Sequence, residues 1–250
     1  MLRGVVIRIL SLVAFFALWE LGSLTLGPRL LPGPGPVLEA MVTQMRSGAL
    51  PASMAATLAR VAASFALAMS FGLAIGYAMG RSRAFDTAAD PWLVLLLNLP
   101  ALVVIILAYI WFGLGEAAAI GAVALNKLPN TVVVIREGAR ALDPGLDEVA
   151  RAYRFGPWKR IRHVVAPQLA PYMAAAARSG LSLVWKIVLV VELLGRPNGI
   201  GFELNTYFQL FDVRMILAYA LAFVAVMLLI ESLLVQPLER HANRWRIRPA

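Results

Sequence analysis

The sequence predicts an all-α, polytopic membrane protein with six transmembrane helices and a helix–turn–helix loop in the cytoplasm. Three observations lead to this fold class. Of the 250 residues, 60 % are hydrophobic and only 15 % are charged, whereas an average soluble domain has about 25 % charged residues. Apolar runs of about 20 residues, the length that crosses a bilayer, recur along the chain. The charged residues gather in short segments between these runs.

The six predicted spans belong to one membrane domain that covers residues 1–250. The first apolar run, 7–26, has no small-residue cleavage site after it, so we expect an uncleaved first helix rather than a signal peptide. A Gly- and Pro-rich connector with a short amphipathic helix follows. In the second span small residues recur and favour close helix packing. After the first, the spans are predicted at 56–80, 91–112 (interrupted by Pro100), 115–134, 170–194 and 215–235.

The distribution of lysine and arginine predicts the orientation of the spans. Six spans put both termini on one side of the membrane. That side holds Arg3, the turn 81–86, the block 136–163 and the arginine-rich tail from 239 to 250. The loops on the other side hold only scattered charges. Because positively charged loops stay in the cytoplasm, both termini and the charged block are predicted to be cytoplasmic.

Several classes of protein are disfavoured by composition. The chain has no cysteine and only two histidines, which excludes disulfides and argues against a cysteine- or histidine-rich metal site. No Gly-x-x-x-x-Gly-Lys-Ser/Thr sequence is present, so the chain has no phosphate-binding loop of its own. The net charge of +9 is explained by cytoplasmic loops rather than by nucleic-acid binding. No cofactor and no metal are expected.

The most polar segment, 143–167, is predicted to form two short amphipathic helices. Asp143 and Pro144 are typical of a helix start, as an N-cap acceptor followed by proline at the first helical position. Phe155-Gly156-Pro157 should break this helix, and Pro167 should end the second one. Apolar residues recur at helical spacing on one face of the first helix: Leu146, Val149, Ala150 and Tyr153.

Two interpretations of this segment follow from its residues. Asp147 and Arg151, four residues apart, are expected to pair on the solvated side of the first helix. The apolar face could then fit a groove on a partner protein. Alternatively, the two helices could lie on a surface of anionic lipid, attracted by their basic residues.

A family resemblance bears on this choice. The pattern "EVARAY…G…AP" is similar to the EAA loop of binding-protein-dependent ABC importer permeases. Glu148 and Ala150 match its first and third positions, and Pro167 matches its terminal proline. At the expected spacing from Pro167 the glycine position of the pattern holds Arg154, and Gly156 follows two residues later. The segments "LLPGPGPVLEAM", "IWFGLGEAA" and "ELLGRPNGIGFEL" resemble, in the same order, the nitrate/sulfonate/taurine branch of these permeases.

The resemblance implies partners and a division of labour. In such importers two permease copies form the pathway in the inner membrane, a separate cytoplasmic ATPase dimer hydrolyses ATP, and a periplasmic or lipid-anchored binding protein delivers the substrate. This chain would therefore carry no catalytic residues. The residues expected to couple it to the ATPase are Glu148, Ala150, Arg151, Tyr153 and Gly156.

Ionisable residues within spans are candidates for the pathway, because each costs roughly 2.5–3.5 kcal/mol on insertion scales. Lys127 and Lys186 lie at similar predicted depths, with polar neighbours on their helices. They could line an anion's path, or they could be structural and pair with carboxylates such as Glu192. Glu192 itself, near the outer end of its span, could serve gating or structure. The pathway candidates are Lys127, Asn130, Ser182, Lys186 and Glu192.

The sequence therefore predicts the transmembrane subunit of an ATP-driven importer for a small anion, such as nitrate, a sulfonate or taurine, or an organic carboxylate. The alternative is a secondary transporter driven by an ion gradient, which would usually show an acidic residue within a span and a repeat between the two halves. An intramembrane enzyme would need a catalytic pair inside the spans, and both histidines lie outside them. The sequence leaves open which anion is carried and whether the second permease is a copy or a paralogue.

Overall fold

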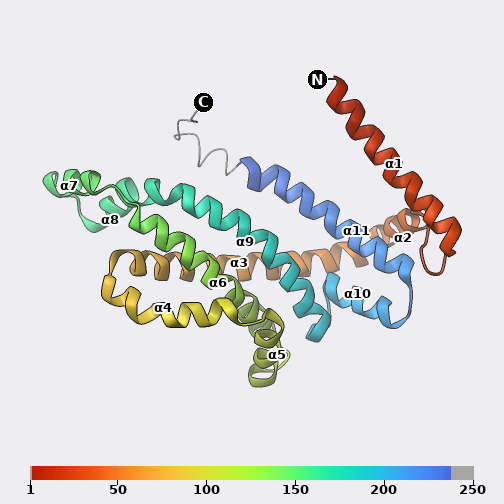
Figure 1. The fold of residues 1–250 in the computed structure, drawn as a ribbon. Coiled ribbons are helices and arrows are strands. Elements are labelled where there is room, and N and C mark those ends of the chain that lie inside the picture. Colours follow the sequence, from red (N-terminus) through yellow and green to blue (C-terminus); the bar gives the residue numbers. More distant parts are fainter. Residues whose placement is uncertain (1, 238–250) are drawn as a thin grey trace. The chain divides into compact units, whose positions relative to one another are not determined.

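The computed structural model describes residues 2–237, which form helices joined by short turns, with no strand among them (Figure 1). The arginine-rich tail over 239–250, which the charge distribution places in the cytoplasm, lies outside the described residues. Contacts divide the described chain into two compact units, one built from 2–57 and 192–227 and the other from 58–191 and 228–237.

The first unit contains the connector after the first helix and the segment that precedes the last helix. Trp19 Nε1 donates to the carbonyl of Pro32 at 2.9 Å, which ties the first helix to the connector that follows it. Tyr219 donates to Gln44 Oε1 at 3.3 Å and ties the last helix to the short amphipathic one. The helices that contribute to this unit are α1 (Leu2–Leu26), α2 (Pro34–Ser47), the start of α3 (Ala49–Arg81), the end of α9 (Ala166–Gly195), α10 (Ile200–Gln209) and most of α11 (Val213–Ile230).

The second unit contains the predicted coupling segment and most of the predicted pathway residues. Ile105, Val123 and Val188, from three different helices, lie in its apolar core with at most 1 % of their surface exposed. Besides the larger parts of α3 and α9, the unit consists of α4 (Arg83–Asn98), α5 (Ala101–Phe112), α6 (Glu116–Arg140), α7 (Pro144–Ala152), α8 (Pro157–Arg160), the π-helical turns η1 (Ile161–Val165) and η2 (Glu231–Val235), and the last residues of α11.

Glycines four residues apart set the packing of α3 against α6. Gly72, Gly76 and Gly80 face α6 so closely that a Cβ on Gly76 would lie 2.7 Å from the carbonyl oxygen of Val132. The facing residues on α6 advance in step with the glycines, up to Ala139 opposite Gly80, so the two helices run parallel. The predicted close packing of this small-residue helix is confirmed at these three glycines.

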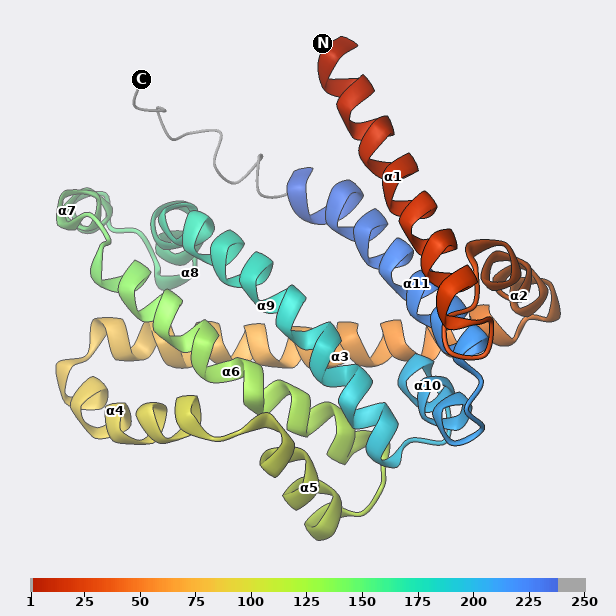
Figure 2. The same cartoon turned by 45° about the vertical axis from the view of Figure 1, so that its right-hand side comes forward.

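A second neighbour of α6 is α9, and these two helices run antiparallel (Figure 2). Gly138 near the end of α6 contacts Tyr172 near the start of α9, whereas Lys127 in the middle of α6 contacts Gly180 further along α9. Alternating directions of this kind are what consecutive membrane spans produce. The region predicted as the fourth and fifth spans therefore forms one antiparallel pair.

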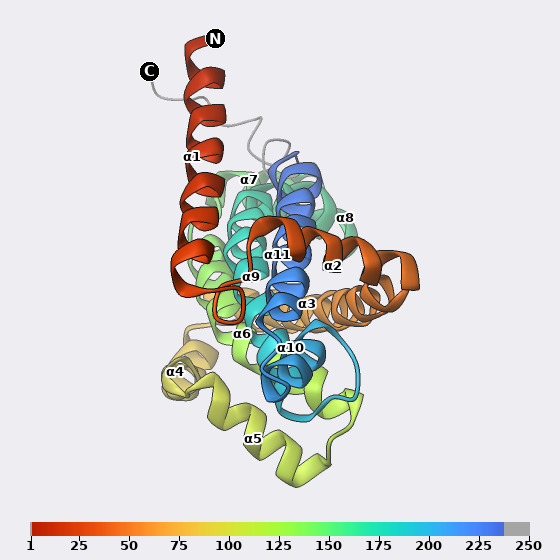
Figure 3. The same ribbon diagram turned by 90° about the vertical axis from the view of Figure 1, so that its right-hand side faces the viewer.

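The segment predicted as the third span, 91–112, consists of two helices. Its interruption at Pro100 is a bend of 98° between α4 and α5 (Figure 3). Proline cannot donate the backbone hydrogen bond that would continue α4. Since α3 and α6 run parallel, α4 and α5 together must return the chain from the end of α3 to the level at which α6 begins. This geometry fits a broken span rather than a re-entrant loop.

The described helices make the chain an all-α polytopic membrane protein. Four of them are long and apolar enough to cross a membrane, namely α3, α6, the continuous helix Pro157–Gly195 and the helix Val213–Val235. The bent pair α4–α5 can supply a fifth span, and α1 contributes a shorter apolar helix, Leu10–Leu26. The total of six crossings stays a prediction.

The prediction that Pro167 ends a separate helix is wrong. The chain is helical without a break from Pro157 to Gly195. Just before the proline, the π-helical turn η1 shifts the hydrogen-bond register, so that the N–H of Ala166 donates to the carbonyl of Ile161, five residues back. Pro167 has no N–H to donate. Because the π-helical turn already changes the hydrogen-bond pattern at this point, the helix can continue without that bond. The helix that carries Lys186 therefore begins at the coupling segment itself.

Candidate functional site

The first helix of the coupling segment begins as predicted. Asp143 is the N-cap of α7, its carboxylate accepts from the N–H of Gly145 at 2.8 Å, and Pro144 occupies the first helical position. At the other end, the N–H of Phe155 donates to Ala150 at 2.8 Å and the N–H of Arg154 donates to Arg151 at 2.9 Å. These two bonds form a Schellman motif, the usual stop signal of a helix.

Arg154 takes the backbone conformation that such a motif normally gives to glycine. Its φ is +50°, in the left-handed region, which is unfavourable for a residue with a side chain. Gly156, in contrast, has φ −64° and serves as the N-cap of α8. The glycine position of the EAA pattern thus has a left-handed backbone here even though arginine occupies it. The sequence could not show this, because φ depends on the formed cap.

The outer face of the coupling segment is apolar and exposed. Tyr153 and Trp158 expose 76 % and 72 % of their surface. Ala150, which was predicted on the same face, is buried instead. At 100° per residue Ala150 lies between the exposed Leu146 and the buried Asp147 around the helix, at the edge of the apolar face. Glu148 and Arg151 are also exposed. The exposed apolar side chains are Leu146, Val149, Tyr153, Trp158 and Ile161.

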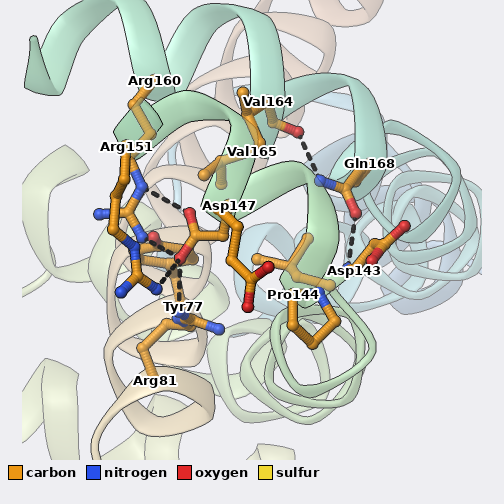
Figure 4. A pocket seen from close by; sticks show the side chains of 12 residues that line it. Tyr77, Arg81, Asp143, Pro144, Asp147, Arg151, Arg160, Val164, Val165 and Gln168 are labelled. Carbon is orange, nitrogen blue, oxygen red and sulfur yellow. Dashed lines mark hydrogen bonds and ion pairs between the residues drawn. The ribbon is translucent and has the colours of Figure 1, made fainter. Parts of the chain in front are cut away.

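The inner face of α7 is organised by Asp147, which sequence reasoning placed on the solvated side. Its carboxylate is buried, and Arg160 donates to it from Nε at 2.7 Å and from Nη2 at 2.6 Å (Figure 4). Arg151 at 3.4 Å and Arg81 at 3.5 Å complete a ring of guanidinium groups. The hydrogen bonds from Arg160 hold the pKa of Asp147 below its usual value. The predicted pair with Arg151 exists, but it is secondary to a partner 13 residues away.

A second polar link fixes the start of α7 to α9. The N–H of Asp143 donates to Gln168 Oε1 at 2.8 Å, and Gln168 Nε2 donates to the carbonyl of Val164 at 2.9 Å (Figure 4). Val164 belongs to the π-helical turn. Gln168 therefore joins the start of α7 to this turn.

The pathway candidates on α9 form an exposed polar face. Arg178, Ser182 and Lys186 follow at intervals of four residues and are all exposed. A shallow pocket of about 490 Å³ includes Arg178, Ser179 and Ser182. Arg178 lies 3.8 Å from Glu231, whereas Lys186 takes part in no ion pair within residues 2–237. The helix therefore presents a lysine whose charge no carboxylate of the described chain offsets.

Lys127 and Lys186 do not share a face. Lys127 is buried, 1 % exposed, and its side chain lies against Gly180 on α9. Lys186 lies six residues beyond Gly180, a rotation of 600°, so the two residues point about 120° apart around α9. Asn130, one turn beyond Lys127, is exposed on α6. Like Lys186, Lys127 makes no ion pair with any described residue. The two lysines therefore lie in different environments, Lys186 exposed and Lys127 buried against α9.

Glu192 belongs to the first unit and is fully buried. Its Oε2 accepts from the N–H of Gly201 and from the hydroxyl of Thr57, both at 2.9 Å. Thr57 Oγ1 in turn accepts from the N–H of Ile200 at 2.8 Å. Gly199, with φ +109°, packs directly against the carboxylate, where a Cβ would lie 2.5 Å from Oε1. The two side chains thus satisfy free donors at the N-terminus of α10, which has no side-chain cap of its own.

Comparison with known proteins identifies the family. The family model described as binding-protein-dependent transport system inner membrane component matches residues 68–244, which is more than half of the chain. The chain belongs to this family. Its members are permease subunits of the inner membrane, and the family implies an ATPase and a periplasmic binding protein as partners. This membership replaces the alternative of a transporter driven by an ion gradient.

Individual relatives agree with this assignment. A putative aliphatic sulfonates transport permease protein, SsuC of Escherichia coli, is 36 % identical over 76 % of this chain and 73 % of its own. The riboflavin transport system permease protein RibX of Chloroflexus aurantiacus is 34 % identical over 94 % and 88 %. A crystal structure of an amino acid ABC transporter with histidines has a TM-score of 0.63 at 21 % identity, over 80 % of this chain and 97 % of its own, which shows a common fold.

Proposed function

We propose that this permease forms, with a second copy of itself, the pathway through which a small anion enters the cell. The observation that carries the proposal is the exposed polar face of α9. Charged residues within spans are costly and rarely face lipid. A single chain leaves Lys186 on its surface, so a second copy is needed to enclose this face. Two such faces would line a polar, cationic path.

The exposed apolar surface of α7, α8 and η1 supports docking of the ATPase. Tyrosine and tryptophan are frequent anchors of protein interfaces, and Tyr153 and Trp158 are both exposed here. Glu148 and Arg151 would supply polar contacts at the edge. This role requires the segment, and with it both chain termini, to lie in the cytoplasm, as the distribution of arginines predicts. Gly156 would contribute by starting α8 at its angle to α7.

The substrate class follows from charge. SsuC is named for aliphatic sulfonates, which are anions, whereas RibX is named for riboflavin. An unpaired lysine within a span favours the anion, since no described carboxylate neutralises Lys186. Lys127 would reach the path only if α9 moved away from α6, because Gly180 covers it. Glu192 is assigned to structure, as the cap of α10.

The substitution Lys186→Met tests the anion pathway. In proteoliposomes with the ATPase and binding protein, uptake of an alkanesulfonate or taurine per folded permease should fall by about 10- to 100-fold, the value of one hydrogen bond to a charged group. ATP hydrolysis stimulated by the binding protein should persist. Arg46→Met, which removes an exposed cation from α2, is the control. Undiminished uptake in Lys186→Met, or competition by riboflavin but by no anion, would contradict the assignment.

The substitution Tyr153→Ala tests the docking surface. Co-purification of the ATPase should fall, because an exposed aromatic anchor is lost, while the amount of permease in the membrane stays the same. Trp92→Ala removes a similarly exposed aromatic side chain from α4 and should leave co-purification unchanged. If Tyr153→Ala instead weakened binding of the segment to vesicles of anionic lipid and left the ATPase bound, the lipid-surface interpretation would replace this one.

A further inference from the structure

We propose that Asp147 is a positioning residue for transport, because its carboxylate joins α7 to α3 and to α8, which continues into α9, and so transmits movement of the coupling segment to both long helices. This inference rests on the docking of the ATPase proposed above. Asp147 itself would touch neither the ATPase nor the substrate, since it lies on the inner face of α7 and is 8 % exposed.

The link to α9 is the stronger one. Arg160 holds both oxygens of Asp147 in a bidentate pair at 2.7 and 2.6 Å, the geometry that gives arginine–carboxylate pairs their directional strength. Arg160 belongs to the continuous helix Pro157–Gly195. A displacement of α7 therefore acts on the same helix that carries Lys186. The bond between Asp143 and Gln168 adds a second connection in the same direction.

The link to α3 passes through Arg81. This arginine is the last residue of α3, and its Nη2 lies 3.5 Å from Asp147 Oδ2. The glycine face of α3, centred on Gly76, packs closely against α6. Asp147 is thus the common partner of α3 and of the helix that runs from α8 into α9, and both of these helices also contact α6.

The charge balance makes the carboxylate necessary for this arrangement. Three guanidinium groups, those of Arg81, Arg151 and Arg160, converge on Asp147. Without the negative charge they would repel one another and have no common partner. Of these groups only the carboxylate is buried, and the arginine side chains are 37–73 % exposed, so its removal leaves them free to turn to solvent. The expected consequence is a coupling segment that still presents its outer face but is no longer held against α3 and α9.

The first test separates coupling from folding. In Asp147→Asn, reconstituted with the ATPase and binding protein, ATP hydrolysis should continue, while the amount of taurine or alkanesulfonate taken up per ATP hydrolysed should fall by at least about five-fold, the lower end of usual coupling effects. Arg81→Gln, which removes only the link to α3, should show a smaller fall. Glu39→Gln, which removes an exposed carboxylate from α2, should behave as the wild type.

The second test restores the link by other means. Because the chain contains no cysteine, Asp147→Cys combined with Arg160→Cys offers two unique thiols. A short reagent that bridges two thiols should recover much of the uptake per ATP, and a reagent that only caps each thiol should not. Recovery with both reagents would contradict a mechanical link.

The outcomes distinguish this inference from the proposal beneath it. If the ATPase failed to co-purify with wild-type permease through α7 and α8, the docking proposal would fall. If docking were normal and uptake per ATP in Asp147→Asn equalled that of the wild type, the inference alone would be overturned. An equal loss of uptake and hydrolysis, following the amount of folded protein, would also overturn it, because Asp147 would then serve folding only.

Discussion

The contact between α3 and α6 makes a quantitative prediction for Gly76→Ala. A Cβ at this position would lie 2.7 Å from the carbonyl oxygen of Val132 and 2.9 Å from Cβ of Ile135. Carbon–oxygen contacts are normally about 3.3–3.6 Å, and carbon–carbon contacts about 3.5–4.0 Å. The helices would therefore have to separate by roughly 0.6–1 Å. Neither contact can be relieved by rotating a flexible side chain, since the atoms belong to the backbone or lie next to it.

The size of the destabilisation follows from comparing two glycine-to-alanine variants. Overpacking of this kind costs about 1–3 kcal/mol, and alanine gains about 1 kcal/mol over glycine inside a helix. Gly121→Ala on α6 is the matched control, because a Cβ there meets no atom within 4 Å. The gain in helix propensity is common to both variants and cancels. Gly76→Ala should therefore be less stable than Gly121→Ala by about 1–3 kcal/mol.

Thermal unfolding of the detergent-solubilised protein, followed by its tryptophan fluorescence, measures this difference. A loss of 1 kcal/mol lowers the midpoint by about 2–4 °C for a chain of this size, so Gly76→Ala should unfold several degrees below Gly121→Ala. Equal midpoints for the two variants would refute the close contact of α3 with α6, and with it the parallel arrangement of these helices.

Three further predictions concern single side chains. Arg154→Gly relieves a left-handed φ and should increase the free energy of unfolding by up to about 1 kcal/mol, which raises the unfolding midpoint. A lower midpoint would contradict the helix stop assigned to this residue. Glu192→Ala leaves the N–H of Gly201 without an acceptor and should cost about 1–3 kcal/mol, with Glu192→Gln less harmful; equal stability of both variants with the wild type would contradict the cap. Folding lowers the pKa of Asp147. The ionised carboxylate therefore contributes its full stabilisation above the pKa of the unfolded state, about 4. This stabilisation is lost as the pH falls through the lower pKa of the folded state. Midpoints of wild type and Asp147→Asn measured from pH 7 downwards should therefore converge only below about pH 4.

Much of the fold could be predicted because apolar length and turn residues are local properties. The start of α7 at Asp143 and the break at Pro100 each depend on one or two neighbouring residues, and both are present. The continuity of the helix through Pro167 could not be predicted from the proline alone. It depends on the π-helical turn Ile161–Val165, which a search for single helix-breaking residues does not detect.

The site was less accessible to sequence reasoning because its partners are distant along the chain. Asp147 has an arginine four residues away, which made a local pair the simplest prediction, but the better geometry is with Arg160 and the burial comes from tertiary packing. In the same way Lys127 and Lys186 looked equivalent by depth. The rotation of α9 that presents Gly180 to Lys127 separates their environments.

The measurement that tests the central claim most directly is transport by the purified permease with defined partners. Proteoliposomes containing the permease and its ATPase, with the binding protein in the outer solution, should accumulate an alkanesulfonate or taurine only when ATP is supplied to the side on which the ATPase is bound. Imposed proton or sodium gradients should have no effect without ATP. Accumulation driven by an ion gradient in vesicles that lack the ATPase would contradict the account.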